Sequence, residues 1–415
     1  MRRILAIISI LLIAPGAVLV AGQRSSAFAD LQPTVILVSF DGFRWDYPTK
    51  APTPNLRALM ARGVRAENLI PSFPSKTFPN HYTIATGLYP GHHGVVANNM
   101  FDPATGRVFA PARSAEVGDA MWWGGEPIWV TAERAGTHAA MLFWPGSEAP
   151  IEGIRPSFWK VYDQNMPGNA RVDQVLEWLD LPGDRRPRFF TLYFEDTDTE
   201  GHAYGPDSKE VRNAIQRDDA YLGRLLAGLD RRGIRNRVNV VVVSDHGMAA
   251  VDDERVVVID DYLQADEVTI SDINPTLGLF PKQGNGDDVY QRLNHANPHL
   301  QVYRRSETPA QWHYRDHPRV PPIVGVADEG WQVMRRSTIA DIRAGKIRGG
   351  RGQHGYDPQL MSMRALFVAA GPAFKRGATI KPFENVSIYN VLARVLDLTP
   401  APNDGDPSIV RALLR

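Results

Sequence analysis

The stretch TVILVSFDG, residues 34–42, sets the pattern of this chain: an unbroken run of β-branched and apolar residues is followed directly by an aspartate and a glycine. Three further runs of the same kind lie at residues 189–194, 238–243 and 365–369. Apolar runs without alternating polar residues are typical of strands that are buried on both faces of a parallel sheet. The four runs therefore predict the strands of a central sheet.

Amphipathic stretches with a helical period separate these runs, at residues 53–62, 170–179 and 209–232. Strands that alternate with helices predict a wound α/β fold, with a largely parallel central sheet and helices on both faces. From about residue 251 to 352 the chain becomes rich in Pro, Asn, Asp, Arg and isolated aromatic residues. We interpret this segment as a smaller substructure of short strands and loops, inserted between two sheet strands of a single domain that spans residues 30–415.

The first 29 residues differ from the rest: two arginines precede an apolar run over residues 4–19, and small residues end at the triplet Ala-Phe-Ala, residues 27–29. This layout is that of a cleavable secretory signal. A membrane anchor would need about 20 consecutive apolar residues, and Pro15 interrupts the run. We therefore expect an exported protein, located in the periplasm, with no stable membrane anchor after the signal is cleaved.

The composition excludes cysteine-based sites and argues against binding to nucleic acids. The chain contains no cysteine, which excludes disulfides, a cysteine nucleophile and thiolate metal ligands. Its 46 basic and 46 acidic residues give a formal net charge of zero, whereas proteins that bind nucleic acids usually carry a basic excess. We expect no binding to duplex nucleic acid. Any phosphate group should be recognised by a few residues of one site rather than by an extended basic surface.

Carboxylates follow three of the apolar runs, at Asp41, Asp198 and Asp245, and histidines accompany them at His202, His246 and His354. In wound α/β sheets, functional sites lie beyond the carboxyl ends of the strands, so we expect these side chains to converge at one edge. An aspartate after a strand is often only a turn residue or a helix cap. The repeated occurrence favours a metal site, and mixed carboxylate and imidazole ligands suit Zn²⁺.

A candidate nucleophile lies in the stretch PSFPSKTFPNH, residues 71–81. Pro79, just inside a stretch of helical character, puts Thr77 near a helix N-terminus, where free backbone N–H groups favour an anion. A threonine hydroxyl needs a base or a metal ion to become nucleophilic at neutral pH. The same local pattern also fits Thr77 as a simple helix N-cap, and the local sequence leaves both interpretations open.

Together these segments resemble the nucleotide pyrophosphatase/phosphodiesterase family, within the alkaline phosphatase superfamily. The matching stretches follow one another along the chain at residues 38–42, 73–81, 87–90, 93–94, 98–103, 143–147, 198–202, 244–248 and 352–355. The resemblance implies an alkaline phosphatase-like fold and a hydrolase that cleaves nucleotide phosphodiester or pyrophosphate bonds. The products would be nucleoside 5′-monophosphates, formed through a phospho-threonine intermediate.

The resemblance also implies two Zn²⁺ ions as cofactors. One would be held by Asp198, His202 and His354, and the other by Asp41, Asp245 and His246. Thr77 would lie between them, with its oxygen on the second ion. The side-chain amide of Asn98 and the backbone N–H of Thr77 would donate to the remaining phosphoryl oxygen.

Aromatic residues are implied as the binding site of a small nucleotide substrate. Phe78 and Tyr162 would sandwich the nucleobase, and Tyr193 would line the same slot. Stacking of this kind is worth about 1–3 kcal/mol per base and tolerates different bases. The alternative is that these aromatic residues belong to the hydrophobic core, and this alternative has most weight for Tyr193, which lies on a predicted strand.

Other enzymes of the superfamily are the main alternatives. A phosphomonoesterase needs additional positive charge around its phosphoryl oxygens, so Asn98 suits the single charge of a diester better. A choline-type phosphodiesterase needs an acidic or aromatic cage, which the segment 251–352 has room to hold. A sulfatase is disfavoured, because we find no Cys/Ser-x-Pro-x-Arg motif. A binding protein without activity would have lost Thr77 or a metal ligand.

Overall fold

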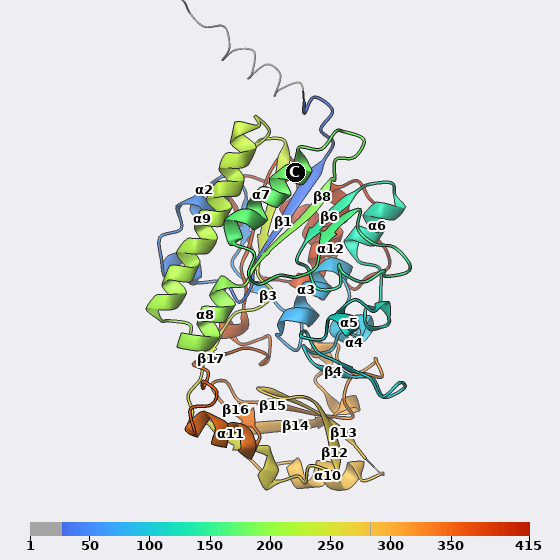
Figure 1. Ribbon diagram of the computed structural model, residues 1–415, viewed down its shortest axis with the longest axis vertical. Helices are drawn as coiled ribbons and strands as arrows, with labels where there is room; N and C mark the ends of the chain where they lie inside the picture. The colour runs from blue at the N-terminus through green and yellow to red at the C-terminus, as the bar shows by residue number, and fades with distance from the viewer. Residues whose placement is uncertain (1–26, 283) are drawn as a thin grey trace, which may run out of the picture.

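The computed structural model describes residues 27–282 and 284–415. The expected signal, residues 1–29, therefore lies almost entirely outside the described residues. Within the described ranges, no helix combines the length and the apolar character that a membrane span requires. An eight-stranded mixed sheet forms the centre of the molecule, in the order β19-β2-β18-β9-β1-β8-β6-β7 (Figure 1).

The four apolar runs form the middle of this sheet, as β1 (Thr34–Phe40), β8 (Phe189–Phe194), β9 (Val238–Val243) and β18 (Phe367–Ala370). Every residue of β1 and β9 is buried, as expected for strands that are covered on both faces. β1 pairs in parallel with both β8 and β9. The wound α/β fold predicted from the sequence is confirmed.

One strand of the middle runs in the opposite direction from the prediction. β18 pairs antiparallel with β9, although the apolar run at residues 365–369 predicted a further parallel strand. A parallel pair needs a crossover that returns the chain to the opposite edge of the sheet. Here the chain leaves β9 at its carboxyl end, passes through residues 251–352, and enters β18 from the same edge. The sheet is therefore mixed.

The outer strands are β6 (Ala139–Leu142) and β7 (Phe158–Lys160) on one side, and β2 (Val64–Ala66) and β19 (Ala378–Ile380) on the other. Short additional pairs are β3 (Leu69–Ile70) with β20 (Phe383–Glu384), β4 (Met100–Phe101) with β5 (Val108–Phe109), and β10 (Ala249–Ala250) with β17 (Gly352–Gln353). β6 and β7 continue the parallel pairing that begins at β8.

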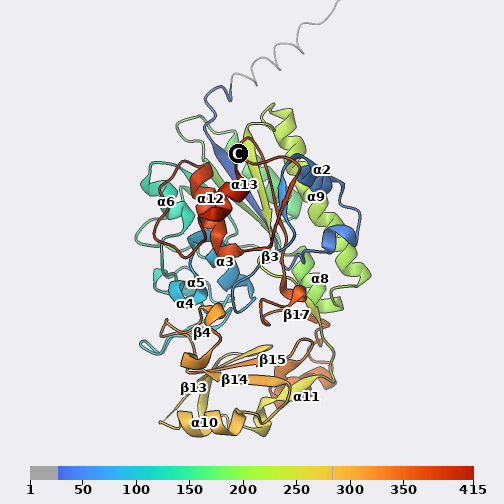
Figure 2. The ribbon, with the colours of Figure 1, turned by 180° about the vertical axis from the view of Figure 1, so that it is seen from behind.

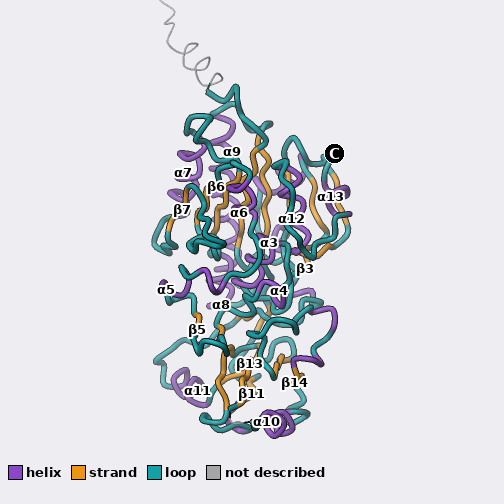
Figure 3. The backbone as a smooth tube through the Cα atoms, turned by 90° about the vertical axis from the view of Figure 1, so that its right-hand side faces the viewer, coloured by secondary structure: helices purple, strands orange, loops and turns teal. Residues whose placement is uncertain are grey.

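Helices cover both faces of the sheet, and the two flanks are seen from behind and from the side in Figures 2 and 3. One face packs against α2 (Pro54–Arg62), α7 (Gly168–Leu179) and α9 (Lys209–Arg231), and the other packs against α3 (Thr77–Thr86), α6 (Ile128–Arg134) and α12 (Ile388–Val395). The remaining helices of this part are α4 (Pro90–His93), α5 (Ser114–Val117), α8 (Asp196–Tyr204) and α13 (Ser408–Leu413). Alternate residues of β1 feed the two cores: Ile36 and Val38 face α2 and α9, while Val35 and Leu37 face the core of α3 and α12.

Residues 251–352 form a second layer beyond the carboxyl edge of the central sheet (Figure 1). Four antiparallel strands make up its sheet, in the order β12 (Val268–Asp272), β13 (Thr276–Pro281), β15 (Ile323–Ala327) and β14 (Leu300–Arg304). The segment also holds β11 (Val256–Val258) paired with β16 (Gln332–Met334), and the helices α10 (Gly286–Leu293) and α11 (Arg336–Arg343). The composition predicted short strands and loops; the two helices were missed because each is only eight residues long and rich in charged residues.

Aromatic stacking and a hydrogen bond hold this layer against the part of the molecule that contains the central sheet. The ring of Trp312 stacks on Phe73, with 3.9 Å between the ring centroids. The Tyr314 hydroxyl donates to the backbone oxygen of Val96 at 2.8 Å. Both aromatic side chains are buried, so this junction is part of the core that also contains α3.

Replacement of Trp312 by alanine should therefore destabilise the whole protein. Trp312 is only 3% exposed, and truncation of a buried Trp typically costs about 3–5 kcal/mol of unfolding free energy. Chemical denaturation followed by circular dichroism measures the change. Ile347→Ala is the control, because Ile347 is 47% exposed and should change the free energy by less than about 0.5 kcal/mol. Equal stability of the two variants would contradict the packing described here.

Candidate active site

Side chains from three adjacent strands meet at the carboxyl edge of the central sheet. Asp41 follows β1, Asp198 lies in the first turn of the helix after β8, and Asp245 and His246 follow β9. The chain can bring Asp41 and Asp198 together because Gly42 has a φ of +63° and carries no side chain. A Cβ atom at this position would lie 3.0 Å from the Cα and Cβ atoms of Asp198, which is tighter than most Cβ contacts.

A first group contains Asp198, His202 and His354. The His202 Nε2 and Asp198 Oδ1 atoms are 3.4 Å apart, and His354 Nε2 lies 3.6 Å from the same oxygen. The two Nε2 atoms are 3.1 Å from each other. Ligands that surround Zn²⁺ tetrahedrally at about 2.0–2.1 Å are themselves roughly 3.3–3.4 Å apart. The spacing of these three atoms therefore fits one tetrahedral ion.

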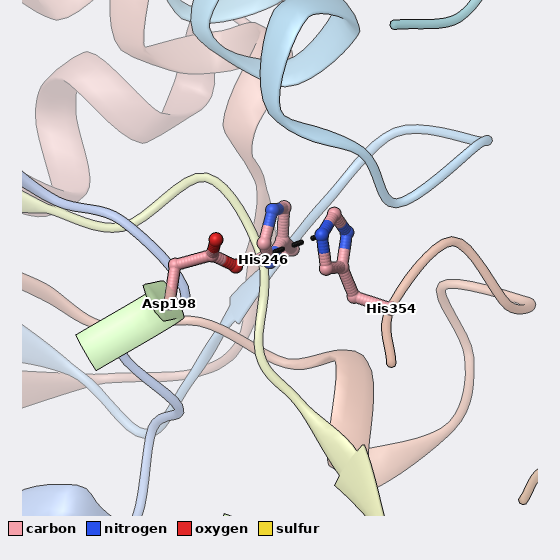
Figure 4. Close-up of side chains that lie close together, drawn as sticks. All are labelled: Asp198, His246 and His354. Atoms are coloured by element: carbon pink, nitrogen blue, oxygen red, sulfur yellow. Dashed lines mark ion pairs between the residues drawn. The ribbon is translucent and has the colours of Figure 1, made fainter. Parts of the chain in front are cut away.

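A second group contains Asp41, Asp245 and His246. His246 Nε2 lies 3.4 Å from Asp41 Oδ1 and 3.0 Å from Asp245 Oδ2. Figure 4 shows that His246 also lies close to Asp198 and His354, and one ligand atom from each of these three lies within 4.8 Å of the others. The rings of His246 and His354 stack with 3.5 Å between their centroids. The two groups are therefore immediate neighbours.

Buried oxygens in both groups lack hydrogen-bond partners. Among the described residues, Asp41 Oδ1, Asp198 Oδ1 and Asp245 Oδ2 are assigned no hydrogen bond. Burial, followed by the charges of Asp245 and Asp198, raises the pKa of Asp41 well above its usual range. Burial also acts to raise the pKa of Asp245, but His246 and His81 outweigh it and lower this pKa to about 2. Crowded carboxylates of this kind are stable when cations lie between them.

The histidines are oriented for metal binding. In each of them the Nδ1 atom faces a backbone carbonyl: Gly352 for His202 at 3.0 Å, Gly247 for His246 at 2.9 Å, and Ser75 for His354 at 2.8 Å. A proton on Nδ1 satisfies each carbonyl and leaves the Nε2 lone pair directed at the site, as in metal-binding histidines generally. The residues present therefore fit two metal ions with nitrogen and oxygen ligands.

Thr77 is the first residue of α3, and Lys76 is its N-cap. The interpretation of Thr77 as a simple N-cap is therefore wrong. Its Oγ1 atom lies 3.2 Å from His246 Nε2, next to the second group. Among the hydrogen bonds of the described residues, none uses the backbone N–H of Thr77, as expected for the first turn of a helix.

Asn98 lies next to the same helix end. Its Oδ1 atom accepts a hydrogen bond from the backbone N–H of Phe78 at 2.9 Å. Its NH₂ group makes no hydrogen bond within the part of the chain that the structure describes, so it remains available as a donor. The two donors that the sequence singled out, at Asn98 and at the Thr77 backbone, are both free beside the threonine.

A cavity of about 460 Å³ opens beside Thr77. It is lined by Thr77, Phe78, Pro111, Ala112, Ser114, Val117, Phe143, Trp144, Pro145, Glu148, Val161, Tyr162 and Tyr193. This volume is in the range of small-molecule sites. All three aromatic residues expected in the nucleobase slot line the cavity, whereas none of the lining residues belongs to the segment 251–352. The segment therefore contributes no side chain to a choline cage in this cavity.

The three aromatic residues differ in their surroundings. Phe78 also packs against Phe109 and Trp123, so it belongs partly to the core. Tyr162 is exposed. Tyr193 has a second contact that the sequence did not reveal: its hydroxyl donates to Asp41 Oδ2 at 2.6 Å. Tyr193 therefore holds a carboxylate of the second group as well as forming a wall of the cavity.

His81 is a further member of the site that was not among the residues expected from the sequence. Its Nδ1 atom lies 2.9 Å from the backbone oxygen of Thr77, and its Nε2 atom is 2.8 Å from Ser39 Oγ. His81 Nδ1 also lies 3.4 Å from Asp245 Oδ2. Its position four residues after Thr77, one helical turn away, was the signal that could have found it.

Comparisons with known proteins agree with this geometry. The family model described as type I phosphodiesterase / nucleotide pyrophosphatase matches residues 35–357. The chain is 41% identical over 399 residues to an uncharacterized pyrophosphatase/phosphodiesterase of Schizosaccharomyces pombe, a match that covers 93% of this chain and 81% of that protein. It is 36% identical over 384 residues to the bis(5′-adenosyl)-triphosphatase of Xenopus laevis, covering 92% and 82% of the two chains.

A solved structure shares the fold. The murine ectonucleotide pyrophosphatase/phosphodiesterase 5, an inactive variant in complex with AMP, superimposes with a TM-score of 0.87 at 37% sequence identity. The match covers 92% of this chain and 100% of the murine one. The fold is therefore alkaline phosphatase-like, with a mixed central sheet between helices. The chain belongs to the type I phosphodiesterase/nucleotide pyrophosphatase family.

Proposed function

We propose that this protein is a two-zinc hydrolase that cleaves nucleotide phosphodiester or pyrophosphate bonds and releases nucleoside 5′-monophosphates. The observation that carries the proposal is the position of Thr77 at the start of α3, with its hydroxyl oxygen 3.2 Å from His246 Nε2 and at the mouth of an aromatic cavity. The AMP bound to the murine relative and the activity named for the Xenopus relative support a nucleotide as substrate.

The metal ions would be bound by the two groups described above. Asp198, His202 and His354 would hold one Zn²⁺, and Asp41, Asp245 and His246 would hold the other with Thr77. The mixture of nitrogen and oxygen ligands is typical of zinc rather than of Mg²⁺ or Ca²⁺. When bound, two such ions neutralise charge on the phosphoryl oxygens and favour the ionised form of an oxygen nucleophile.

Thr77 would be the nucleophile. Its Oγ1 atom would lose its proton to solvent and form a bond to phosphorus while the bond from phosphorus to the leaving oxygen breaks, and the leaving oxygen would take up a proton from solvent. Water then hydrolyses the phospho-threonine, releases the nucleoside 5′-monophosphate and restores the hydroxyl. The Asn98 NH₂ group and the Thr77 backbone N–H would donate to the non-bridging oxygen, where charge increases in the transition state.

The cavity would bind the nucleobase. Phe78 and Tyr162 supply aromatic faces for stacking, and Tyr193 closes the cavity while it holds Asp41.

The organisation that we propose around this site is a single catalytic domain over residues 30–415 with an insert at about 251–352. The sequence pattern at residues 1–29 supports export to the periplasm, and the charge balance argues against binding to duplex nucleic acid.

Thr77→Ala should lower the turnover of p-nitrophenyl thymidine 5′-monophosphate by at least about 1,000-fold, because the hydroxyl is the only atom that attacks phosphorus. Zinc content by elemental analysis and the melting temperature should stay near their wild-type values. Thr379→Ala is the matched control, since Thr379 lies on the exposed edge strand β19. Normal turnover by the Thr77 variant would exclude it as the nucleophile.

Removal of metal should stop the reaction, because both ligand groups would then carry uncompensated charge. We expect chelation to abolish hydrolysis of p-nitrophenyl thymidine 5′-monophosphate and zinc to restore it. The restored enzyme should prefer this diester to p-nitrophenyl phosphate and to p-nitrophenyl phosphorylcholine, compared by kcat/KM. Preference for the phosphate would indicate a phosphomonoesterase, and preference for the phosphorylcholine a choline-type phosphodiesterase. Full activity after complete metal removal would contradict the two-zinc proposal.

Tyr162→Ala should raise the KM for the nucleotide ester about 5- to 100-fold, which corresponds to the loss of one stacking contact. The KM for bis(p-nitrophenyl) phosphate, which has no nucleobase, should change much less. Val161→Ala serves as the control, because the neighbouring Val161 also lines the cavity but has no aromatic face. An equal rise in KM for both substrates would remove Tyr162 from nucleobase binding.

A further inference from the structure

Lys76, the residue before Thr77, carries a buried charge. Its side chain is 5% exposed, and its ammonium group forms an ion pair with Asp272, whose side chain is 7% exposed. The same nitrogen donates to the backbone oxygen of Asn274 at 3.3 Å. A buried ammonium is stable only when it is paired and hydrogen-bonded, and both partners here come from the segment 251–352.

The segment presents Asp272 to Lys76 through an irregular strand. The pairing of β12 with β13 shifts register between Ile270 and Asp272, and such bulges change the direction of the side chain that follows. The Thr276 hydroxyl donates to Asp272 Oδ2 at 2.6 Å, which is the same oxygen that Lys76 reaches. The segment itself therefore holds the Asp272 carboxylate in position, independently of its ion pair with Lys76.

The backbone around Lys76 also supports the site. The Ser75 carbonyl accepts the hydrogen bond from His354 Nδ1 at 2.8 Å, and the Ser75 hydroxyl donates to the backbone oxygen of Tyr356 at 2.9 Å. A Cβ atom at Gly355 would lie 2.9 Å from Lys76 Cε, so this loop lies directly on the lysine. A displacement of residues 75–77 would move both the nucleophile and the partner that orients His354.

We propose that Asp272 is a positioning residue of the reaction, which acts through the Lys76 ion pair to fix Thr77 and His354. The inference rests on the proposed role of Thr77 as nucleophile. It gives the segment 251–352 a part in catalysis although none of its residues lines the substrate cavity. A shift of about 1 Å in a reacting group can cost roughly 100-fold in rate, so a link that holds the nucleophile matters more for kcat than for binding.

A second buried ion pair offers a matched control. Arg319 of the same segment pairs with Asp102 at 2.9 Å, with side chains that are 7% and 11% exposed. This pair also joins the segment to the rest of the molecule. However, its hydrogen bonds involve no residue of the stretch 72–81. A purely structural role predicts that the two pairs behave alike, whereas a positioning role predicts that they differ.

The test compares Asp272→Asn with Asp102→Asn in the full mature, zinc-loaded protein. Asp272→Asn should lower kcat for p-nitrophenyl thymidine 5′-monophosphate at least about 10-fold, with KM within about threefold and zinc content unchanged. Amide hydrogen exchange in the peptide that covers residues 72–81 should become faster. Asp102→Asn should lower the melting temperature yet keep kcat within about twofold, with unchanged exchange in that peptide.

Two further variants keep the test decisive if Asp272→Asn folds poorly. Thr276→Val removes only the donor to Asp272 and should shift kcat and exchange in the same direction by a smaller factor. Asp272→Glu keeps the charge and should recover part of kcat. Equal kcat losses in the Asp272 and Asp102 variants, or unchanged exchange at residues 72–81 in Asp272→Asn and Thr276→Val, would overturn the proposal.

The exchange measurement also separates this inference from the proposed function, because it needs no substrate. If the wild-type protein did not hydrolyse the diester, or if Thr77→Ala kept its activity, the proposed function would fail. Faster exchange in the Asp272 variant would still support the link to the loop. If instead the wild type were active and the Asp272 variant matched it in kcat and in exchange, only the positioning role would be lost.

Discussion

The structure depends on a concentration of negative charge and nitrogen lone pairs at one edge of a buried sheet. Asp41, Asp198 and Asp245 each place near His246 an oxygen that makes no hydrogen bond within the described part of the chain. In water these groups would be hydrated. At this buried edge the dielectric constant is lower, so the carboxylates repel one another more strongly. Cations bound between these groups would resolve the conflict, so that one requirement would govern both stability and chemistry at this site.

The fold supplies this edge because β1, β8 and β9 are parallel to one another. β1, β8 and β9 all end on the same side, and each delivers its carboxylate within a few residues of the strand end. The strands are mostly apolar because helices cover both faces, which leaves the strand ends as the main place for charged side chains. Gly42, which has no side chain, allows the segment after β1 to approach the segment after β8 closely. The core and the site are thus consequences of one arrangement.

The remaining parts of the molecule hold Thr77, the proposed nucleophile, in place. α3 begins at Thr77, whose backbone N–H makes no hydrogen bond among the described residues and lies beside the candidate metal ligands. Asn98 fixes the backbone at Phe78 from one side. From the other side, the segment 251–352 reaches Lys76 through Asp272. The aromatic cavity lies apart from that segment, which separates the part of the chain that would select the substrate from the part that supports the threonine.

The sequence by itself determined the strands and the candidate ligands. Continuous apolar runs predicted the bounds of β1, β8 and β9 without error. The Asp and His residues that follow these strands identified the sheet edge at which the candidate ligands meet. Both predictions succeeded because they rest on local sequence patterns. Only the tertiary structure decided the direction of β18, the hydrogen bond from Tyr193 to Asp41, the contact of His81 with Asp245 and the pairing of Lys76 with Asp272. Each of these joins residues far apart in the chain or depends on the direction of a side chain. Local periodicity carries no information about such contacts, which exist only once the packing of the whole domain has fixed them.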